Sequence, residues 1–269
     1  MFSRMNGNSR LGKREHNELR PLKVTYDVYL YTQGSVLFEI GGTKILCSVT
    51  LQNSVPHFLR GKRKGWLTAE YALLPAATPI RTVREVSANK RNGRTIEISR
   101  LIGRALRSIA NLSVLGENTI FIDCDVLQAD GGTRTACITA AYLALKSAQQ
   151  RLMHDGVIDA PILTDEIASI SVGMGTYGPL LDMDFAEDSA IYADYNFVIS
   201  RTGKVIEIQG SAEYSPISWT DFDELKNLAL KGANDIFNFY NQNGYNLVIS
   251  DKKPLDSYIP SYRDVVDYI

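Results

Sequence analysis

A strand-like run, two glycines and a helix-like run follow one another in the middle of the chain and constrain its fold most. Residues 119–127 have the character of a strand, and apolar residues recur at helical spacing after Thr133. Gly131 and Gly132 let backbone amides approach a ligand without side chains in the way. A helix starting at Thr133 would point free N–H groups at the same place, and Arg134 can hold two oxygens of one phosphate. The segment predicts an anion site; the alternative is an ordinary strand–turn–helix corner with Thr133 as the cap.

Length and composition predict a globular protein with a substantial core. The 269 residues are 45% hydrophobic and 22% charged, which suits one large domain or two smaller ones. No apolar run reaches the ~18 residues of a membrane span, and the polar, basic opening is not a secretory signal. The three cysteines are odd in number and form no C-x-x-C pair, which favours buried thiols in a cytoplasmic protein. The three scattered histidines argue against a Ser-His-Asp or histidine–metal site.

Charge is distributed unevenly along the chain. The net charge is −1, but residues 60–107 contain twelve Lys and Arg against three Glu. Such segregation is a candidate electrostatic footprint for a polyanion such as a nucleic acid. The alternative is a solvated basic face.

The order of the expected elements indicates two α+β halves of related layout. Three short strands separated by glycine turns suggest a meander, followed by a fourth strand, a long loop at 75–94 and a helix at 94–110. Residues 149–160 are predicted to be a polar connector. The second half has four strands and a helix, expected at 167–174, 180–185, 191–200, 204–209 and 220–241. The predicted divisions are a flexible arm at 1–18, one folded domain of two halves at 19–243, and a tail at 244–269.

Arg94 is a second candidate for anion binding. It lies in the first turn of the helix predicted at 94–110, where the helix dipole favours acids rather than bases. A bound anion would relieve that mismatch. The alternative is that Arg94 points into water.

An acidic stretch at residues 180–188 is a candidate for metal binding or acid–base chemistry. In an extended run, Asp182 and Asp184 would share one face, and a turn would follow through Glu187 and Asp188. Crowded carboxylates repel one another unless they bind a cation or one stays protonated. Mg²⁺ suits such oxygen ligands, while a raised pKa would create a general acid. A solvated acidic strand edge is the remaining alternative.

Several motifs, in this order, resemble ribonuclease PH, and the similarity runs from about residue 19 to residue 233. They are GSVL (34–37), GWLTAEY (65–71), NGRT (92–95), RLIGR (100–104), DCDVLQADGGTRT (123–135), EDS (187–189) and EIQG (207–210). The resemblance implies an α+β fold of two βα halves, each similar to one domain of a small-subunit ribosomal protein. Residues 19–243 would then form the catalytic domain.

The resemblance also implies an activity and an assembly. It implies a phosphorolytic 3′→5′ exoribonuclease, a nucleotidyltransferase that trims tRNA precursors with inorganic phosphate and releases nucleoside diphosphates. The reverse reaction would add nucleotides. The implied cofactor is Mg²⁺, and the implied assembly is a homo-hexamer built as a trimer of dimers.

Individual site residues follow from the matching motif positions. Arg94 and residues 132–134, which are Gly132, Thr133 and Arg134, correspond to the phosphate site. Asp182 and Asp188 correspond to the acidic pair, expected to bind Mg²⁺ and, for one of them, to protonate the departing 3′ oxygen. Arg81 and Arg84 correspond to arginines that grip RNA, contacts that position rather than specify.

The chain departs from the family pattern in places. Ala76 stands where the family usually has an arginine, Asn92 where it commonly has a glycine, and residues 214–218 and the chain beyond 244 differ. These differences affect the expected RNA grip and ring contacts rather than the phosphate site. The alternative function is an inactive, RNA-binding scaffold subunit of a ribonuclease PH-type ring, but the key arginines and acids are present.

Overall fold

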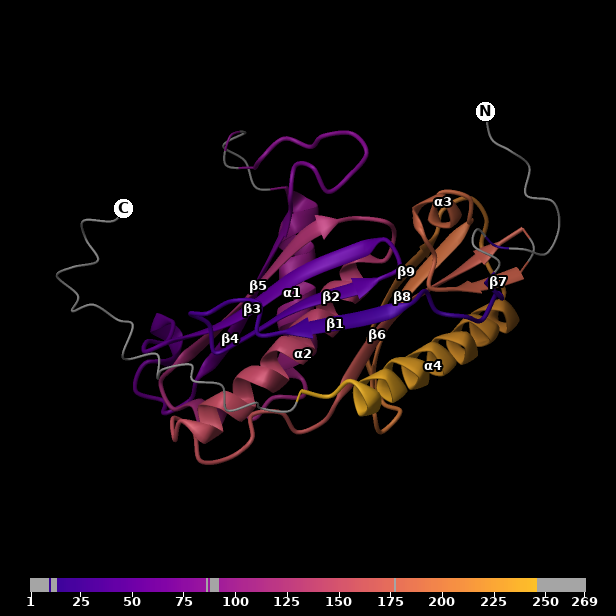
Figure 1. Cartoon of the computed structure of the whole chain (residues 1–269). Helices are drawn as coiled ribbons and strands as arrows, with labels where there is room; N and C mark the ends of the chain where they lie inside the picture. Colours follow the sequence, from indigo (N-terminus) through magenta and orange to yellow (C-terminus); the bar gives the residue numbers. More distant parts are fainter. Residues whose placement is uncertain (1–9, 11–13, 86, 88–91, 177, 246–269) are drawn as a thin grey trace.

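The fold of this computed structural model is built on two sheets and a helix that packs against both (Figure 1). The structure describes residues 10, 14–85, 87, 92–176 and 178–245. The first sheet has the order β1-β2-β3-β5-β4. Its strands are β1 (Leu22–Tyr26), β2 (Gly34–Ile40), β3 (Thr43–Gln52), β4 (Trp66–Leu73) and β5 (Thr119–Gln128). The predicted meander β1–β3 is present, whereas β4 pairs in parallel with β5. A parallel pair needs a crossover, and α1 (Gly93–Arg107) lies within it.

The second sheet is antiparallel throughout, with the order β7-β6-β8-β9. Its strands are β6 (Ile167–Gly175), β7 (Gly178–Leu181), β8 (Ala193–Ser200) and β9 (Val205–Ala212). The four-residue helix α3 (Phe185–Asp188) lies between β7 and β8, and α4 (Trp219–Gln242) packs against β6 and β7. Two short 3-10 turns, His57–Leu59 and Leu112–Leu115, complete the described elements. The predicted α+β class is thus confirmed.

Helix α2 (Thr133–His154) connects the two halves. It packs against β2, β3 and β5 of the first sheet and against β6 and β8 of the second. It is buried on nearly all sides between Thr133 and Leu152, as expected for a helix without a polar face. Because β5 and α2 are adjacent in sequence, the start of this central helix lies where the halves meet. The connector predicted at 149–160 is wrong in part, since α2 continues to His154.

The acidic stretch does not form the extended run predicted at 180–185. Strand β7 ends at Leu181, Asp182 adopts φ +50°, and α3 begins at Phe185. A positive φ breaks the alternation of a strand, so Asp182 and Asp184 do not share one face. Asp184 instead caps α3 by accepting a hydrogen bond from the Glu187 amide at 2.9 Å.

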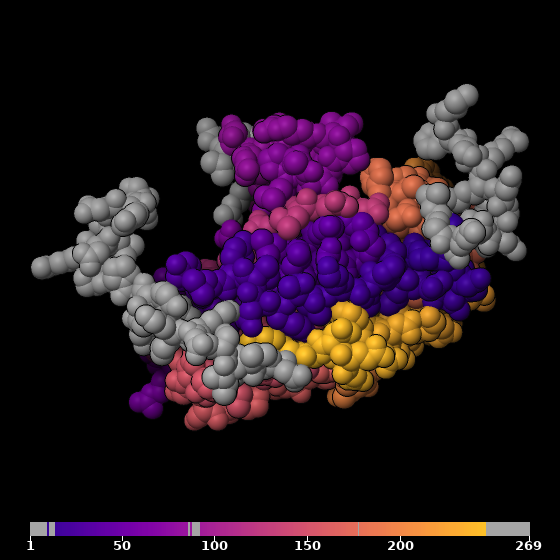
Figure 2. Space-filling view, viewed as in Figure 1, coloured from indigo at the N-terminus to yellow at the C-terminus, as the bar shows by residue number. Residues whose placement is uncertain are grey.

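The long loop predicted at 75–94 is confirmed for its described residues 75–85, 87 and 92, which form no helix or strand, whereas Gly93 and Arg94 already belong to α1. This segment stands out from the body of the molecule (Figure 2). Across the described ranges, no helix is both long and apolar enough to cross a membrane.

Candidate active site

The turn between β5 and α2 has the geometry of an anion cradle. Gly131 and Gly132 have φ of +78° and +64°, and Gly132 is the residue that caps α2. Gly132 has no side chain to bond the first amides of the helix, so those N–H groups face the space in front of α2. A helix start at Thr133 is confirmed. The residue before the helix is Gly132 and not Thr133, which the alternative of an ordinary corner named as the cap.

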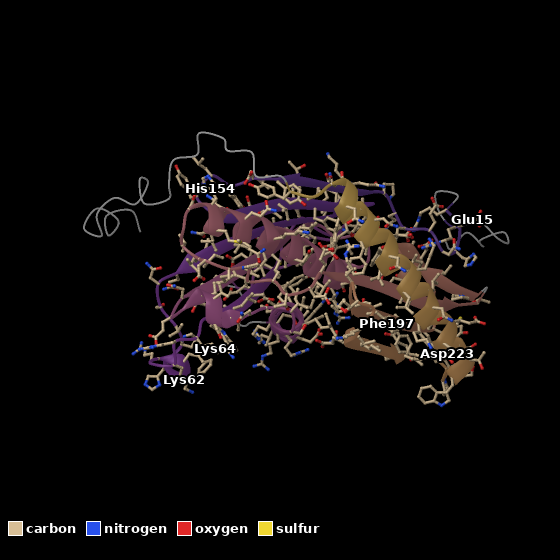
Figure 3. The ribbon with its side chains drawn as sticks, turned by 90° about the horizontal axis from the view of Figure 1, so that it is seen from below. Glu15, Lys62, Lys64, His154, Phe197 and Asp223 are labelled. Carbon is tan, nitrogen blue, oxygen red and sulfur yellow. The ribbon has the colours of Figure 1, made fainter. Side chains whose placement is uncertain are left out.

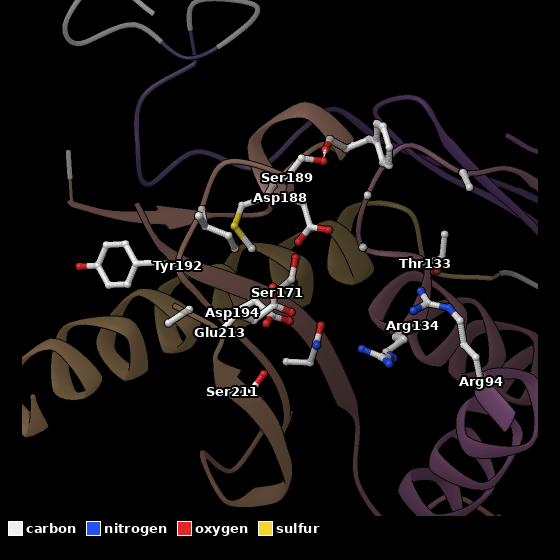
Figure 4. Close-up of a pocket in the computed structure, with 18 of the residues that line it drawn as sticks. Arg94, Thr133, Arg134, Ser171, Asp188, Ser189, Tyr192, Asp194, Ser211 and Glu213 are labelled. Atoms are coloured by element: carbon white, nitrogen blue, oxygen red, sulfur yellow. Dashed lines mark hydrogen bonds between the residues drawn. The ribbon is translucent and has the colours of Figure 1, made fainter. Parts of the chain in front are cut away.

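Both predicted phosphate-binding arginines reach the space in front of this turn. Arg94 lies in the first turn of α1, where the Asn92 side chain accepts a hydrogen bond from the Arg94 amide at 3.1 Å. Arg134 lies in the first turn of α2. Both arginines line one pocket of about 710 Å³, and Figure 4 shows them on the same flank of it. Asn92, which departs from the family pattern, thus has a capping role that glycine cannot perform.

One nitrogen of the Arg134 guanidinium has a hydrogen-bond partner in the protein, and another has none. Its Nη2 donates to Glu97 Oε2 at 3.1 Å, so an acid on α1 orients the guanidinium. Its Nε is buried and has no hydrogen-bond partner in the protein. A buried donor without a partner is costly. The free Nε is therefore a candidate donor to an anion.

Carboxylates form the opposite wall of the pocket. Asp188 at the end of α3 faces Asp194 on β8 and Glu213 just after β9, and Figure 4 shows these three away from the arginines. Burial and then the neighbouring charge of Asp194 raise the pKa of Asp188 above its usual value, with a smaller contribution from Glu213. Arg94 and Arg134, which line the same pocket, lower that pKa. The pocket therefore places concentrated positive charge beside paired carboxylates.

Asp182, predicted to belong with Asp188, lies outside this pocket lining. It is only 2% exposed, and Arg20 binds both of its oxygens, at 2.7 Å from Nη2 to Oδ1 and 3.0 Å from Nε to Oδ2. A carboxylate whose oxygens are already engaged by a buried guanidinium does not fit the predicted role of direct metal ligand or acid. Its place opposite Asp188 is taken by Asp194.

Two arginines near the N-terminus pair with Glu187 of the acidic stretch. Arg10 is 8% exposed and binds Glu187 at 2.6 and 2.7 Å, and Arg14 reaches the same carboxylate at 3.2 Å. These contacts lower the pKa of Glu187 against the opposing effect of burial. The predicted flexible arm at 1–18 is therefore wrong for Arg10 and Arg14; residues 1–9 and 11–13 lie outside the described residues.

The predicted RNA-binding arginines are exposed on the projecting loop. Arg81 and Arg84 precede α1, and Arg84 lines a second cavity of about 990 Å³ together with Arg94 and Arg100. Arg94 borders both cavities, so a basic path leads from the loop to the phosphate pocket. The basic segment 60–107 is not one patch, however. In Figure 3, Lys62 and Lys64 lie at one end of the molecule.

Asp194, Ser171 and Glu213 are pocket residues that sequence reasoning missed. Asp194 follows Asp188 by six positions and lies on the next strand, β8. Only the turn after α3 brings the two carboxylates together, so their spacing in the sequence does not reveal the pair. Ser171 on β6 has a buried hydroxyl without a partner in the protein and lines the same pocket. Nothing in the local sequence distinguishes Ser171 from an ordinary strand residue.

Comparison with known proteins identifies the class of this fold and pocket, a family of 3′ exoribonucleases. Residues 18–150 match the model of the RNase_PH family, described as "3′ exoribonuclease family, domain 1". Ribonuclease PH of Neisseria meningitidis serogroup B is 48% identical over 223 residues, which is 83% of this chain and 92% of that protein. Ribonuclease PH of Bacillus velezensis is 50% identical over 220 residues, or 81% and 90%.

Solved structures support the fold. An Archaeoglobus fulgidus exosome with RNA bound to the active site matches with a TM-score of 0.73 and 22% identity, covering 87% of this chain and 93% of that one. Rice (Oryza sativa) Rrp46 matches with a TM-score of 0.71 and 20% identity, covering 87% and 99%. The chain therefore belongs to the ribonuclease PH family, and the predicted class of phosphorolytic exoribonuclease is confirmed.

Proposed function

We propose that this chain trims the 3′ ends of tRNA precursors by phosphorolysis within the pocket described above. The observation that carries the proposal is the convergence of Arg94, Arg134 and the start of α2 on one space opposite Asp188. Inorganic phosphate must be held beside an anionic phosphodiester, and preorganised positive charge offsets that repulsion. Holding both reactants also removes the entropy of association.

Each part of the basic wall has its own task. The amides that follow Gly132, with Thr133 among them, would bind the phosphate oxygens. Arg134 would use its unpartnered Nε, since Glu97 already engages Nη2. Arg94 borders both cavities and is placed to contact both the phosphate and the RNA end.

The reaction balances with hydrogenphosphate as the attacking group. One of its oxygens forms a bond to the phosphorus of the terminal phosphodiester, and the bond from that phosphorus to the 3′ oxygen of the preceding nucleotide breaks. The products are a nucleoside diphosphate and an RNA shorter by one nucleotide. Hydrogenphosphate loses one proton and the departing 3′ oxygen gains one, so the protons balance. Arg94 and Arg134 would stabilise the negative charge that gathers on the transferring group.

The carboxylate wall fits Mg²⁺. The charge of Asp194 raises the pKa of Asp188, and a divalent cation would relieve that repulsion. Within the described ranges, no group of three or more His, Cys, Asp or Glu side chains is arranged to hold a metal ion. Mg²⁺ is often held by only one or two carboxylates together with substrate phosphate and water. When bound, Mg²⁺ would neutralise charge on the phosphoryl group.

RNA would approach along the projecting loop. Arg81 and Arg84 are exposed there, and guanidiniums on a protruding segment can hold a phosphate backbone without reading its sequence. A homo-hexamer of the trimer-of-dimers kind and a cytoplasmic location complete the proposal. The family membership supports the first, and the three buried free cysteines support the second.

A product assay tests the proposed function. The protein is incubated with a short RNA and Mg²⁺, with or without inorganic phosphate, and products are separated by chromatography. Nucleoside diphosphates that form only with phosphate are expected. Nucleoside monophosphates in either reaction would indicate hydrolysis, and RNA binding with no product would favour the scaffold alternative.

A further inference from the structure

Arg20 is a buried arginine outside the pocket lining that contacts both the turn before α2 and the acidic segment leading to Asp188. It is 5% exposed. Its backbone amide, Nε and Nη2 donate to the two oxygens of Asp182 at 2.7, 3.0 and 2.7 Å. The same guanidinium donates through Nη1 to the Asp130 carbonyl and through Nη2 to the Gly131 carbonyl at 3.4 Å. One side chain thus joins the turn at residues 130–132, called here the phosphate turn, to the acidic segment at residues 180–188.

These two partners belong to different halves of the fold. Asp130 and Gly131 form the turn that begins α2, whereas Asp182 follows β7 and leads into α3, which ends at Asp188. The phosphate turn and Asp188 come from segments about fifty residues apart. Their relative position therefore depends on contacts between segments, and Arg20 makes several of the strongest, charge-assisted ones.

Asp182 is held in a conformation that needs support. Its φ of +50° is uncommon for a residue other than glycine. Its amide donates to the Ser171 carbonyl at 2.8 Å, and its carboxylate is fixed by Arg20. Ser171 itself lines the pocket. The strained residue is thus tied to the pocket through its backbone and to the phosphate turn through Arg20.

Stability alone does not explain this ion pair. Burying two charges costs desolvation energy, and replacing a buried ion pair by uncharged residues is often neutral for stability or better. A bidentate guanidinium–carboxylate contact does provide a fixed distance and direction. Positioning is the contribution that an uncharged pair could not reproduce.

We propose that Arg20 and Asp182 are positioning residues that set the distance between the phosphate site and Asp188. The inference rests on the proposed function. A misplacement of the reacting groups by about 1 Å can cost on the order of 100-fold in rate. Loss of this pair therefore acts on phosphate use and turnover, and not on Mg²⁺ or RNA affinity.

The test uses paired neutralisation to keep the fold. Arg20→Met together with Asp182→Asn removes both charges, and asparagine tolerates the positive φ. Arg20→Lys is the second variant, which keeps the charge but loses the planar fork. The control is Lys146→Met with Glu166→Gln, which removes a partly exposed ion pair of 2.5 Å between α2 and the residue before β6, away from the pocket. Melting temperature and assembly size verify folding.

Four constants are measured for each protein: kcat, the KM for phosphate, the half-saturating Mg²⁺ concentration, and the Kd for RNA without phosphate. In the paired variant, and to a smaller degree in Arg20→Lys, kcat divided by the phosphate KM is expected to fall about 10- to 100-fold. The Mg²⁺ and RNA constants should stay within about twofold, as should all four in the control.

The outcomes separate this inference from the proposed function. A parent protein that forms no nucleoside diphosphate overturns the proposed function itself. An active parent whose Arg20 and Asp182 variants lose no more than the control shows a merely structural ion pair and overturns the inference. A rise in the Mg²⁺ requirement with unchanged phosphate KM identifies Asp182 as a metal ligand and also overturns it. If the paired variant does not fold, the same criteria apply to Arg20→Lys.

Discussion

The phosphate turn depends on a glycine that approaches another backbone closely, and Gly131→Ala tests that dependence. Gly131 has φ +78°, and an added Cβ would lie 2.4 Å from the Met183 carbonyl oxygen and 2.7 Å from the Asp184 carbonyl carbon. A left-handed conformation costs a non-glycine residue about 1–2 kcal/mol. Forcing a methyl group into a packed site costs about 1–3 kcal/mol more. The two costs together predict a loss of about 2–5 kcal/mol.

Gly203→Ala separates the two costs. Gly203 has φ +77°, but a Cβ there would meet no atom within 4 Å. The control therefore carries the conformational cost alone, and the effect of alanine on the unfolded chain is the same for both. The difference between the variants should be about 1–3 kcal/mol. At about 2–4 °C per kcal/mol for a chain of this size, Gly131→Ala should melt about 2–12 °C below Gly203→Ala.

The measurement is thermal unfolding by circular dichroism at one protein concentration, followed by the phosphorolysis assay below both transitions. Gly131→Ala should also lose activity, because the new methyl group pushes the phosphate turn away from the segment that carries Asp188. Gly203→Ala should keep the parent's activity. Equal melting temperatures for the two variants would refute the claim that the turn packs tightly against residues 183–184.

Three further outcomes are expected. Arg134→Lys should raise the KM for phosphate at least roughly tenfold with RNA affinity kept, since a charge-assisted hydrogen bond contributes about 1.5–3 kcal/mol; an equal loss of RNA affinity would contradict its role. Without divalent ions, Asp188→Asn should have a higher melting temperature than the parent at pH 7 but not at roughly pH 3.5. Burial and Asp194 raise the pKa of Asp188 above 3.8. The parent therefore loses stability as the pH rises through that raised pKa, whereas the asparagine variant does not. Calorimetry at both pH values checks this sign. Arg81→Ala with Arg84→Ala should weaken RNA binding and reduce the slope of log K against log salt concentration by about 0.7 per contact removed. An unchanged slope in anisotropy titrations would indicate that the loop is a solvated basic face that does not bind RNA.

Local chemistry in the sequence was sufficient to predict the glycine turn and the two arginines of the pocket. Two glycines before a helical run can be identified without coordinates, because positive φ and a helix start are properties of a few adjacent residues. Arg94 and Arg134 were identified in the same way, each in the first turn of a predicted helix, and the structure places both in one pocket. The α+β class followed from the order of periodic segments.

Long-range pairing of charges was decided only by the tertiary structure. Asp182 and Asp188 look equivalent within one acidic stretch, yet Asp182 binds Arg20, 162 positions earlier, and Asp188 faces Asp194 on the next strand. A carboxylate's role depends on which charge reaches it and on how much water remains, and neither is encoded in its neighbours along the chain. The sequence thus determined which residues could bind phosphate, and the packing of the two halves determined which acid faces them.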